Sequence, residues 1–161
     1  MAGVRAGRAD RADDHLAIGD LYSAYADLMS RRAYAELAEI FLPDTAVVVE
    51  LPSHTREIRG PEAFGEFVAQ RIAHLAFFQF VNLNVLVDLA GDEPHDRASA
   101  RLHFCELHHD AADGGMRVLH GLYQDGFAKR DDRWWFVRRR FTPLAVVEGG
   151  VDVFGYPELD T

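Results

Sequence analysis

The sequence feature that most constrains the fold is a long hairpin near the end of the chain. Residues 120–140 read HGLYQDGFAKRDDRWWFVRRR, in which two apolar and aromatic runs flank the polar turn KRDD. Such runs on both sides of a short polar turn are typical of two antiparallel strands. One strand carries His120, Tyr123 and Asp125, and the other carries two tryptophans and three arginines. We therefore expect the hairpin to form the back of a ligand pocket, with the rest of the chain wrapped around it.

The residues before the hairpin alternate between helical and extended patterns. Apolar residues recur at helical spacing from 14 to 29, from 34 to 41 and from 61 to 72. Extended patterns cover 45–51, 77–89, 96–109, 116–129 and 133–141, and a short one is suggested at 56–59. Three helices in the N-terminal half followed by a four-strand meander predict an α+β fold. We expect the helices to pack across one face of a long, curved, mostly antiparallel sheet, which leaves a cone-shaped cavity.

The 161 residues are expected to form one domain over 13–144. Asp13 and Asp14 precede the first helical pattern and can cap that helix. Residues 1–12 are mainly Ala, Arg, Gly and Asp and are predicted to be a disordered leader. Residues 145–161 are predicted to be a C-terminal tail that lies over the domain as a loop.

Charge and cysteine content exclude several classes of partner. The chain has 17 basic and 26 acidic residues, a net charge of −9, which argues against nucleic acid and against anionic membranes. No apolar run approaches the roughly 20 residues that a membrane helix needs. The only cysteine, Cys105, cannot form an intrachain disulfide, so we expect a cytoplasmic protein. The arginines at 138–140 are expected to be solvated or paired with carboxylates.

Three polar residues of the sheet are candidates for a site. If the hairpin before residue 120 pairs His109 with Met116, then His103, Cys105 and His120 share one face. Histidine and cysteine bind zinc and similar ions, and a His–Cys pair can act as a nucleophile. The set lacks any recognised metal spacing, and Cys105 is expected to be a buried small hydrophobe. We therefore expect no metal and no cofactor.

Other polar residues are weighed against structural roles. His108 and His109 end a strand beside acidic residues and are expected to be solvated. Asn82 and Asn84 are predicted to share a strand face with Phe80 and are candidates for ligand contacts. In the hairpin, Tyr123 is expected to pack in the core and Asp125 to pair with an arginine of the next strand.

The order of elements, the segment LYSAYADLMSRRAYAELAEIFLPDTAVV and the hairpin together resemble the SnoaL-like group of the nuclear-transport-factor-two-like superfamily. The resemblance covers residues 14–144, and the chain looks most like scytalone dehydratases and hexachlorocyclohexane dehydrochlorinases. It implies a cone-shaped barrel that forms a homodimer or another homo-oligomer through its sheet. Many members are cofactor-free lyases, isomerases, hydrolases or cyclases that act on hydrophobic small molecules, and others are not catalytic.

The same resemblance implies where an Asp–His dyad would lie. Counting along the family pattern from Tyr25 and Asn84, the aspartate position is Ser30 and the histidine position is Phe80. On this count both members of the dyad are replaced. Counting back from Trp134, the second pocket histidine of scytalone dehydratases falls on His120.

Two functions remain open. The first is a cofactor-independent isomerase, cyclase or dehydratase that acts on a hydrophobic cyclic or polyketide-like small molecule, with His120 as its acid/base. Its predicted substrate-binding residues are Tyr25, Ser30, Phe80, Asn82, Asn84 and His103. The second is a non-catalytic small-molecule-binding protein, or an assembly subunit resembling the β subunits of ring-hydroxylating dioxygenases. The replaced dyad favours the second.

Overall fold

The computed structural model describes residues 3–51, 53–91, 95–110, 112, 114–148 and 151–153, and side chains from residue 11 to residue 148. The helices are α1 (Gly3–Arg31), the 3-10 helix η1 (Tyr34–Glu39) and α2 (Pro61–Ile72). The strands are β1 (Phe41–Leu51), β2 (His54–Arg59), β3 (Leu75–Leu89), β4 (Arg97–Asp110), β5 (Met116–Arg130), β6 (Arg133–Val147) and β7 (Val151–Val153).

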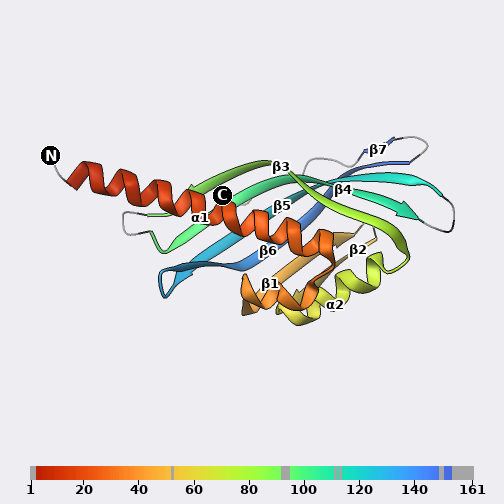
Figure 1. The fold of residues 1–161 in the computed structure, drawn as a ribbon, viewed down its shortest axis with the longest axis horizontal. Helices are drawn as coiled ribbons and strands as arrows, with labels where there is room; N and C mark the ends of the chain where they lie inside the picture. Colours follow the sequence, from red (N-terminus) through yellow and green to blue (C-terminus); the bar gives the residue numbers. More distant parts are fainter. Residues whose placement is uncertain are drawn as a thin grey trace.

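The described strands form one open sheet in the order β2-β1-β6-β5-β4-β3, and β7 pairs with β6. Strands β1 and β6 run parallel, and the other neighbouring strands run antiparallel. Helix α1 lies across one face of the long strands, and α2 lies beside β1 and β2 (Figure 1). The predicted α+β fold, with three helices on a curved and mostly antiparallel sheet, is confirmed.

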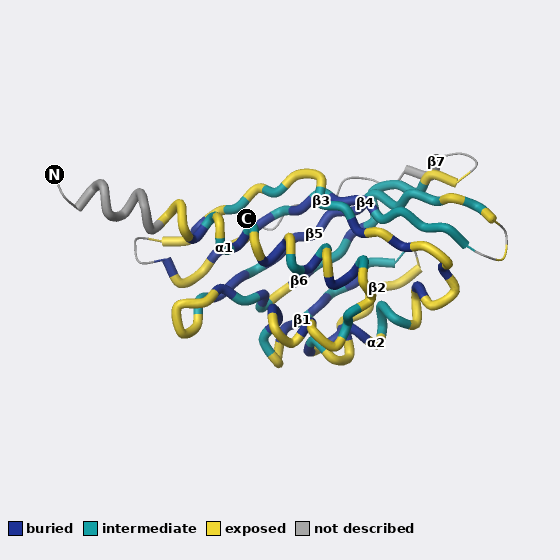
Figure 2. The backbone as a smooth tube through the Cα atoms, viewed as in Figure 1, coloured by how far each residue is buried: buried dark blue, intermediate teal, exposed yellow. Residues whose placement is uncertain are grey.

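The core lies between α1 and the middle of the sheet. Tyr22 and Tyr25 lie three residues apart on α1, so both side chains point at the sheet, and each is only 1% exposed. Their rings meet Phe136 of β6 at 5.6 and 6.3 Å between centroids. Burying an aromatic side chain of this size contributes roughly 1.5–3 kcal/mol. Figure 2 shows buried backbone beneath α1 and only intermediate burial toward the end of the long strands beside β7.

The β5–β6 hairpin forms as predicted. Asp131 and Asp132 both have positive φ, 49° and 59°, which is the conformation of a two-residue turn that twists with its strands. Aspartate tolerates this conformation better than most residues because its short side chain bonds locally. The preceding hairpin also has the predicted register, with His109 opposite Met116 and Cys105 opposite His120.

Two predicted boundaries are wrong. Residues 145–161 were expected to lie over the domain as a loop, but β6 continues to Val147 and β7 pairs with it. The extension lets the first residues of β5 pair their backbone groups, for example Val118 with Val147. Helix α1 begins at Gly3, well before Asp13. The predicted tail beyond residue 153 lies outside the described residues.

A bulge in β3 changes which side chains share a face. The register of β3 on β4 shifts between Asn82 and Asn84, where Asn82 pairs with Phe104 and Asn84 with His103. An extra residue reverses the alternation of side chains that follow it. The prediction that Asn84 shares the face of Phe80 and Asn82 is therefore wrong.

Candidate active site

A cavity of about 370 Å³ lies between α2, β1 and the end of the sheet where β4 and β6 finish and β3 and β5 begin. It is lined by Val49, Glu50, Leu51, Phe64, Phe67, Val68, Arg71, Ile72, His74, Leu75, Phe78, Glu106, His108, Arg117, Leu119, Tyr123, Phe141, Pro143 and Val146. Most of these side chains are apolar or aromatic. An apolar wall with a few polar groups is typical of a small-molecule site.

The polar part of the wall contains a histidine–carboxylate pair on one strand. Glu106 and His108 are two residues apart in β4, so their side chains point to the same face of the sheet. The Nε2 atom of His108 lies 3.0 Å from Oε2 of Glu106. The side chain of His108 is 18% exposed, and that of Glu106 is 19% exposed. The imidazole stacks on the ring of Phe78, with centroids 5.4 Å apart and planes at 30°. The pair is thus held between a neighbouring strand and the cavity.

Charged side chains at one end of the cavity compensate one another. Asp110 Oδ2 lies 3.8 Å from His74 Nε2 and 3.7 Å from Arg117 Nη1. Arg117 Nε lies 2.5 Å from Glu148 Oε1. These contacts join the ends of α2, β4 and β6 to the start of β5. They leave the interior of the cavity predominantly apolar.

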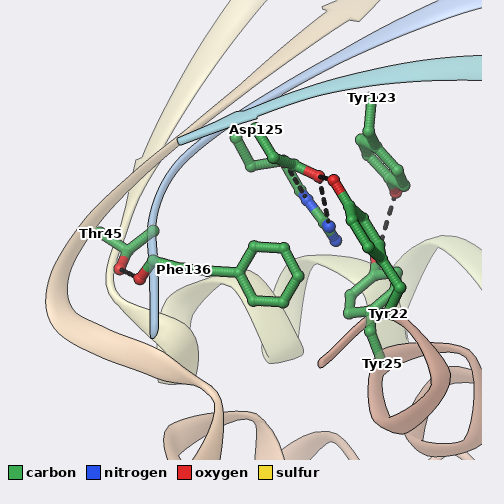
Figure 3. A network of polar contacts seen from close by, with 7 residues as sticks. Tyr22, Tyr25, Thr45, Tyr123, Asp125 and Phe136 are labelled. Carbon is green, nitrogen blue, oxygen red and sulfur yellow. Dashed lines mark hydrogen bonds and ion pairs between the residues drawn. The ribbon is translucent and has the colours of Figure 1, made fainter. Parts of the chain in front are cut away.

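Beneath the cavity lies a buried ion pair surrounded by tyrosines. Asp125 accepts two hydrogen bonds from Arg139, both of 2.8 Å, and one of 2.7 Å from the Tyr22 hydroxyl. Figure 3 shows Tyr22 pointing at Asp125 and Tyr25 reaching Tyr123. The Arg139 guanidinium is 4.1 Å from the Tyr25 ring centroid and 4.0 Å from that of Tyr123. The predicted pairing of Asp125 with an arginine of the next strand is confirmed.

Burial keeps the tyrosines of this network protonated. Desolvation raises the pKa of Tyr25 to about 12, and it raises the pKa of Tyr123 well above 10. The two hydroxyl oxygens are 3.1 Å apart. Tyr123 lines the cavity, but its phenol does not supply a base near neutral pH. Its ring forms part of the cavity floor above the ion pair.

The structure brings three predicted site residues together away from the cavity. The Phe80 backbone N–H donates to Ser30 Oγ at 3.0 Å, and the rings of Tyr25 and Phe80 meet edge to face at 5.2 Å. Phe80 also stacks on Phe104 at 4.7 Å, and Phe104 on Tyr123 at 4.5 Å. The two positions at which the resemblance places the dyad are therefore neighbours. The hydroxyl of Ser30 occupies one of these positions, and the stacked ring of Phe80 occupies the other.

The other predicted site residues lie elsewhere. On β5 the lining residues Arg117, Leu119 and Tyr123 alternate with His120, which therefore points to the outer face of the sheet. His103 and Asn84 lie on the same outer face. The Asn82 side chain donates to the backbone oxygen of Tyr22 at 3.1 Å. None of the seven predicted site residues is among the described residues that line the cavity. Their roles stay predictions.

His103, Cys105 and His120, which share the outer face, do not form a metal centre. In the described part of the chain, no three His, Cys, Asp or Glu residues are placed to hold an ion. Burial, and then the charge of Glu106, raises the pKa of the Cys105 thiol. A raised pKa lowers the thiolate fraction, so Cys105 behaves as the small hydrophobe that the sequence predicts.

Sequence reasoning missed the histidine–carboxylate pair. His108 was expected to be solvated because it lies near a turn, but the cavity and Phe78 enclose most of it. One signal could have found it. Leu102, Phe104, Glu106 and His108 alternate along β4 and therefore share one face, and the first two are buried. The polar residues continue an apolar stripe onto the inner face of the sheet.

A second hollow of about 740 Å³ is more open and lies between η1, α2 and the turn before α2. Its lining is mainly alanine, glycine and proline, with Tyr34, Arg59, Glu62 and Glu66. The histidine–carboxylate pair belongs to the smaller cavity, which is therefore the candidate site. None of the described helices is long and apolar enough to cross a membrane.

Comparisons with known proteins agree with this fold. Residues 10–140 match the sequence profile of the SnoaL-like domain. A hexachlorocyclohexane dehydrochlorinase from Novosphingobium barchaimii is 20% identical, with a TM-score of 0.77 over 93% of this chain and 99% of that one. A proposed scytalone dehydratase from Novosphingobium aromaticivorans is 20% identical, with a TM-score of 0.76 over 94% and 99%.

A third similar structure is a proposed aromatic ring hydroxylase from Novosphingobium aromaticivorans, 21% identical, with a TM-score of 0.68 over 85% of this chain and 94% of that one. At these identities the similarity establishes the fold alone. No match was found among the curated proteins.

Proposed function

This chain belongs to the SnoaL-like domain family, and we propose that it is a cofactor-free enzyme that acts on a hydrophobic small molecule in the cavity beside α2. The proposed reaction is an elimination such as dehydration, an isomerisation or a cyclisation. The substrate class is cyclic or polyketide-like. Two similar structures carry the names of a dehydratase and a dehydrochlorinase, which are eliminating enzymes, and this supports the choice of reaction.

The observation that carries the proposal is the composition of the cavity wall. Rings from Phe64, Phe67, Phe78 and Phe141 can cover the apolar body of a ligand. Among the polar groups of the wall, Glu106 and His108 lie together on β4. A volume of about 370 Å³ suits a compact cyclic molecule. Such a wall holds a reactive substrate close to its reacting groups and excludes water, which accelerates reactions by proximity.

The test compares two tryptophan substitutions at adjacent positions of β5. Leu119 lines the cavity, and Val118 points to the opposite face. We expect Leu119→Trp to abolish binding of the apolar fluorescent dye prodan and turnover of any active member of a panel of cyclic hydroxyketones and halides. Val118→Trp should leave both within about two-fold of wild type. Equal losses in both variants, with both still folded by circular dichroism, would contradict the choice of cavity.

The second candidate is a non-catalytic ligand-binding protein. It is favoured by one observation, which is that Ser30 and Phe80, the positions at which the resemblance places the family dyad, carry no carboxylate or imidazole and bond to each other. The same experiment separates the two functions. Ligands that bind in a Leu119-dependent way and are recovered unchanged from wild type support the binding protein, whereas their conversion supports the enzyme.

A further inference from the structure

A proton-transfer reaction in this cavity cannot use the positions of the family dyad. Ser30 Oγ accepts the Phe80 backbone N–H, and the Phe80 ring is stacked on Phe104. Neither a serine hydroxyl in this setting nor a phenyl ring takes up a proton near neutral pH. The tyrosines beneath the cavity hold their protons, because burial raises their pKa. The acid/base group must therefore come from another side chain of the wall.

We propose that His108 is the general acid/base of the cavity and that Glu106 is its positioning residue. This inference rests on the proposed function, because it assigns a residue to the reaction proposed above. Unperturbed imidazole titrates near pH 6.5, so histidine can both accept and return a proton at neutral pH. A carboxylate beside the imidazole can hold the cation that forms.

The hydrogen bond between the two side chains sets which nitrogen is basic. An ionised carboxylate only accepts hydrogen bonds, so the proton between His108 Nε2 and Glu106 Oε2, 3.0 Å apart, belongs to the histidine. The lone pair is then on Nδ1. In this tautomer Nδ1 can take a proton from a substrate carbon, and Nε2–H remains bound to Glu106.

The pair is also held rigidly. His108 lies in the middle of a three-strand ladder, opposite Phe78 of β3 and Arg117 of β5. The Phe78 ring stacks on the imidazole and restricts its rotation. Groups placed on a strand of a sheet are positioned more tightly than groups on a loop. Asp110 and Glu148 neutralise Arg117, the cation opposite His108 on β5, so its charge does not dominate the site.

Three other histidines of the chain fit the role less well. His74 also lines the cavity, but its side chain is 55% exposed and lies 3.8 Å from Asp110. His109 follows His108 directly and therefore points to the outer face of the sheet. His120 lies on that outer face as well. Among these side chains, His108 combines a place in the cavity wall with a carboxylate partner.

The chemical step balances without a co-reactant. A C–H bond next to a carbonyl group of the substrate breaks, and its proton moves to His108 Nδ1. The electron pair enters the carbonyl as an enolate. In a dehydration, the enolate expels the β-hydroxyl group, which takes the proton back from Nδ1 and leaves as water. In an isomerisation, Nδ1 returns the proton to another carbon. Glu106 accepts the hydrogen bond from Nε2–H throughout and holds the transient imidazolium.

The test uses nitrobenzisoxazole, a compact apolar aromatic whose ring opens when a base removes one carbon-bound proton. The proton moves to the base, the N–O bond breaks, and a coloured cyanophenolate forms. We expect wild type to accelerate ring opening in a saturable way. His108→Gln should lower kcat by about 100-fold or more, the usual contribution of a positioned base. His109→Gln, the adjacent histidine on the opposite face, should stay within about two-fold of wild type.

Glu106 needs a separate comparison because it acts through His108. We expect Glu106→Gln to lower kcat by about ten-fold with KM nearly unchanged, and Glu106→Asp to restore part of kcat. Nitrogen-15 shifts of His108 should show the Nε2–H tautomer in wild type and a mixture of tautomers in Glu106→Gln. Circular dichroism establishes that each variant is folded.

The inference is overturned if wild type does not accelerate ring opening, if His108→Gln keeps its kcat, or if the loss appears in His120→Gln instead. These outcomes differ from failure of the proposed function. In that case the hydroxyketones and halides are not converted, although His108-dependent opening of nitrobenzisoxazole persists.

Discussion

At the scale of single residues, the Asp125–Arg139 pair is the most demanding feature of the core. Both side chains are fully buried, and Asp125 receives three hydrogen bonds from Arg139 and Tyr22. Removing two charges from water is costly, and the cost is offset only when geometry and hydrogen bonding are good. The aromatic rings of Tyr25 and Tyr123 on Arg139 add cation–π attraction. Loss of one charge would leave the other without compensation.

We therefore expect Asp125→Asn to lower the free energy of unfolding by about 3–5 kcal/mol, the usual cost of breaking a buried pair. The measurement is urea denaturation followed by tryptophan fluorescence. Asp27→Asn is the matched control, because Asp27 forms an exposed pair with Arg31 on α1. That variant should leave the urea midpoint unchanged. Similar shifts in both variants would show that burial does not govern the contribution of the pair.

At the scale of elements, local patterns predict structure well where each residue's neighbours are close in sequence. The β5–β6 hairpin is of this kind, because a polar turn with Asp131 and Asp132 joins two aromatic runs. The shift after Asn82 depends on how β3 fits β4, and the extension of β6 depends on its pairing with the start of β5. Both involve residue pairs that are far apart in the sequence, such as Val118 with Val147.

The candidate site follows the same rule. Asp125 could be assigned to an arginine because both lie in one hairpin. His108 could not be assigned to a cavity, because α2 and β1 supply the opposite wall and lie far earlier in the chain. His120 drew attention through its motif, and only the alternation along β5 shows that it faces away from the cavity.

The start of α2 gives a prediction at this scale. Gly60 precedes α2 with φ of +82°, and a Cβ atom there would lie 2.8 Å from the Pro43 oxygen. We expect Gly60→Ala to destabilise the protein by about 1–3 kcal/mol and to weaken prodan binding, because α2 forms one wall of the cavity. Gly91→Ala is the control, since Gly91 has a similar φ of +77° but open space around it. If both substitutions lowered the thermal unfolding midpoint equally, the close contact with Pro43 would not explain the loss of stability.

At the scale of the whole molecule, the outer face of the sheet is the surface most suited to another copy of the chain. Phe77, Leu86 and Met116 are 45%, 54% and 55% exposed there. Exposed apolar residues of this size that share one face commonly mark an interface. The homo-oligomer through the sheet is a proposal, and His103 and His120 would lie at or near that interface.

We expect a dimer or larger oligomer by light scattering coupled to size exclusion, and we expect Leu86→Glu to shift it toward monomer. Leu16→Glu is the control, because Leu16 is 69% exposed on α1, away from the sheet face. A wild-type chain that is monomeric at micromolar concentrations would contradict the proposal. So would an oligomer that resists Leu86→Glu.

The tyrosine floor of the cavity has a consequence for how this protein can change. The ion pair that demands a fixed geometry lies below Tyr123, while Glu106, His108 and the apolar lining lie above it. Substitutions around the opening need not disturb the charged centre, so selection can vary what enters the cavity at little cost to folding. The fold therefore tolerates substitutions around the cavity opening better than substitutions at the buried ion pair. A library confined to Phe67, Val68 and Arg71, which line the cavity from α2 without being fully buried, should therefore yield mostly folded chains.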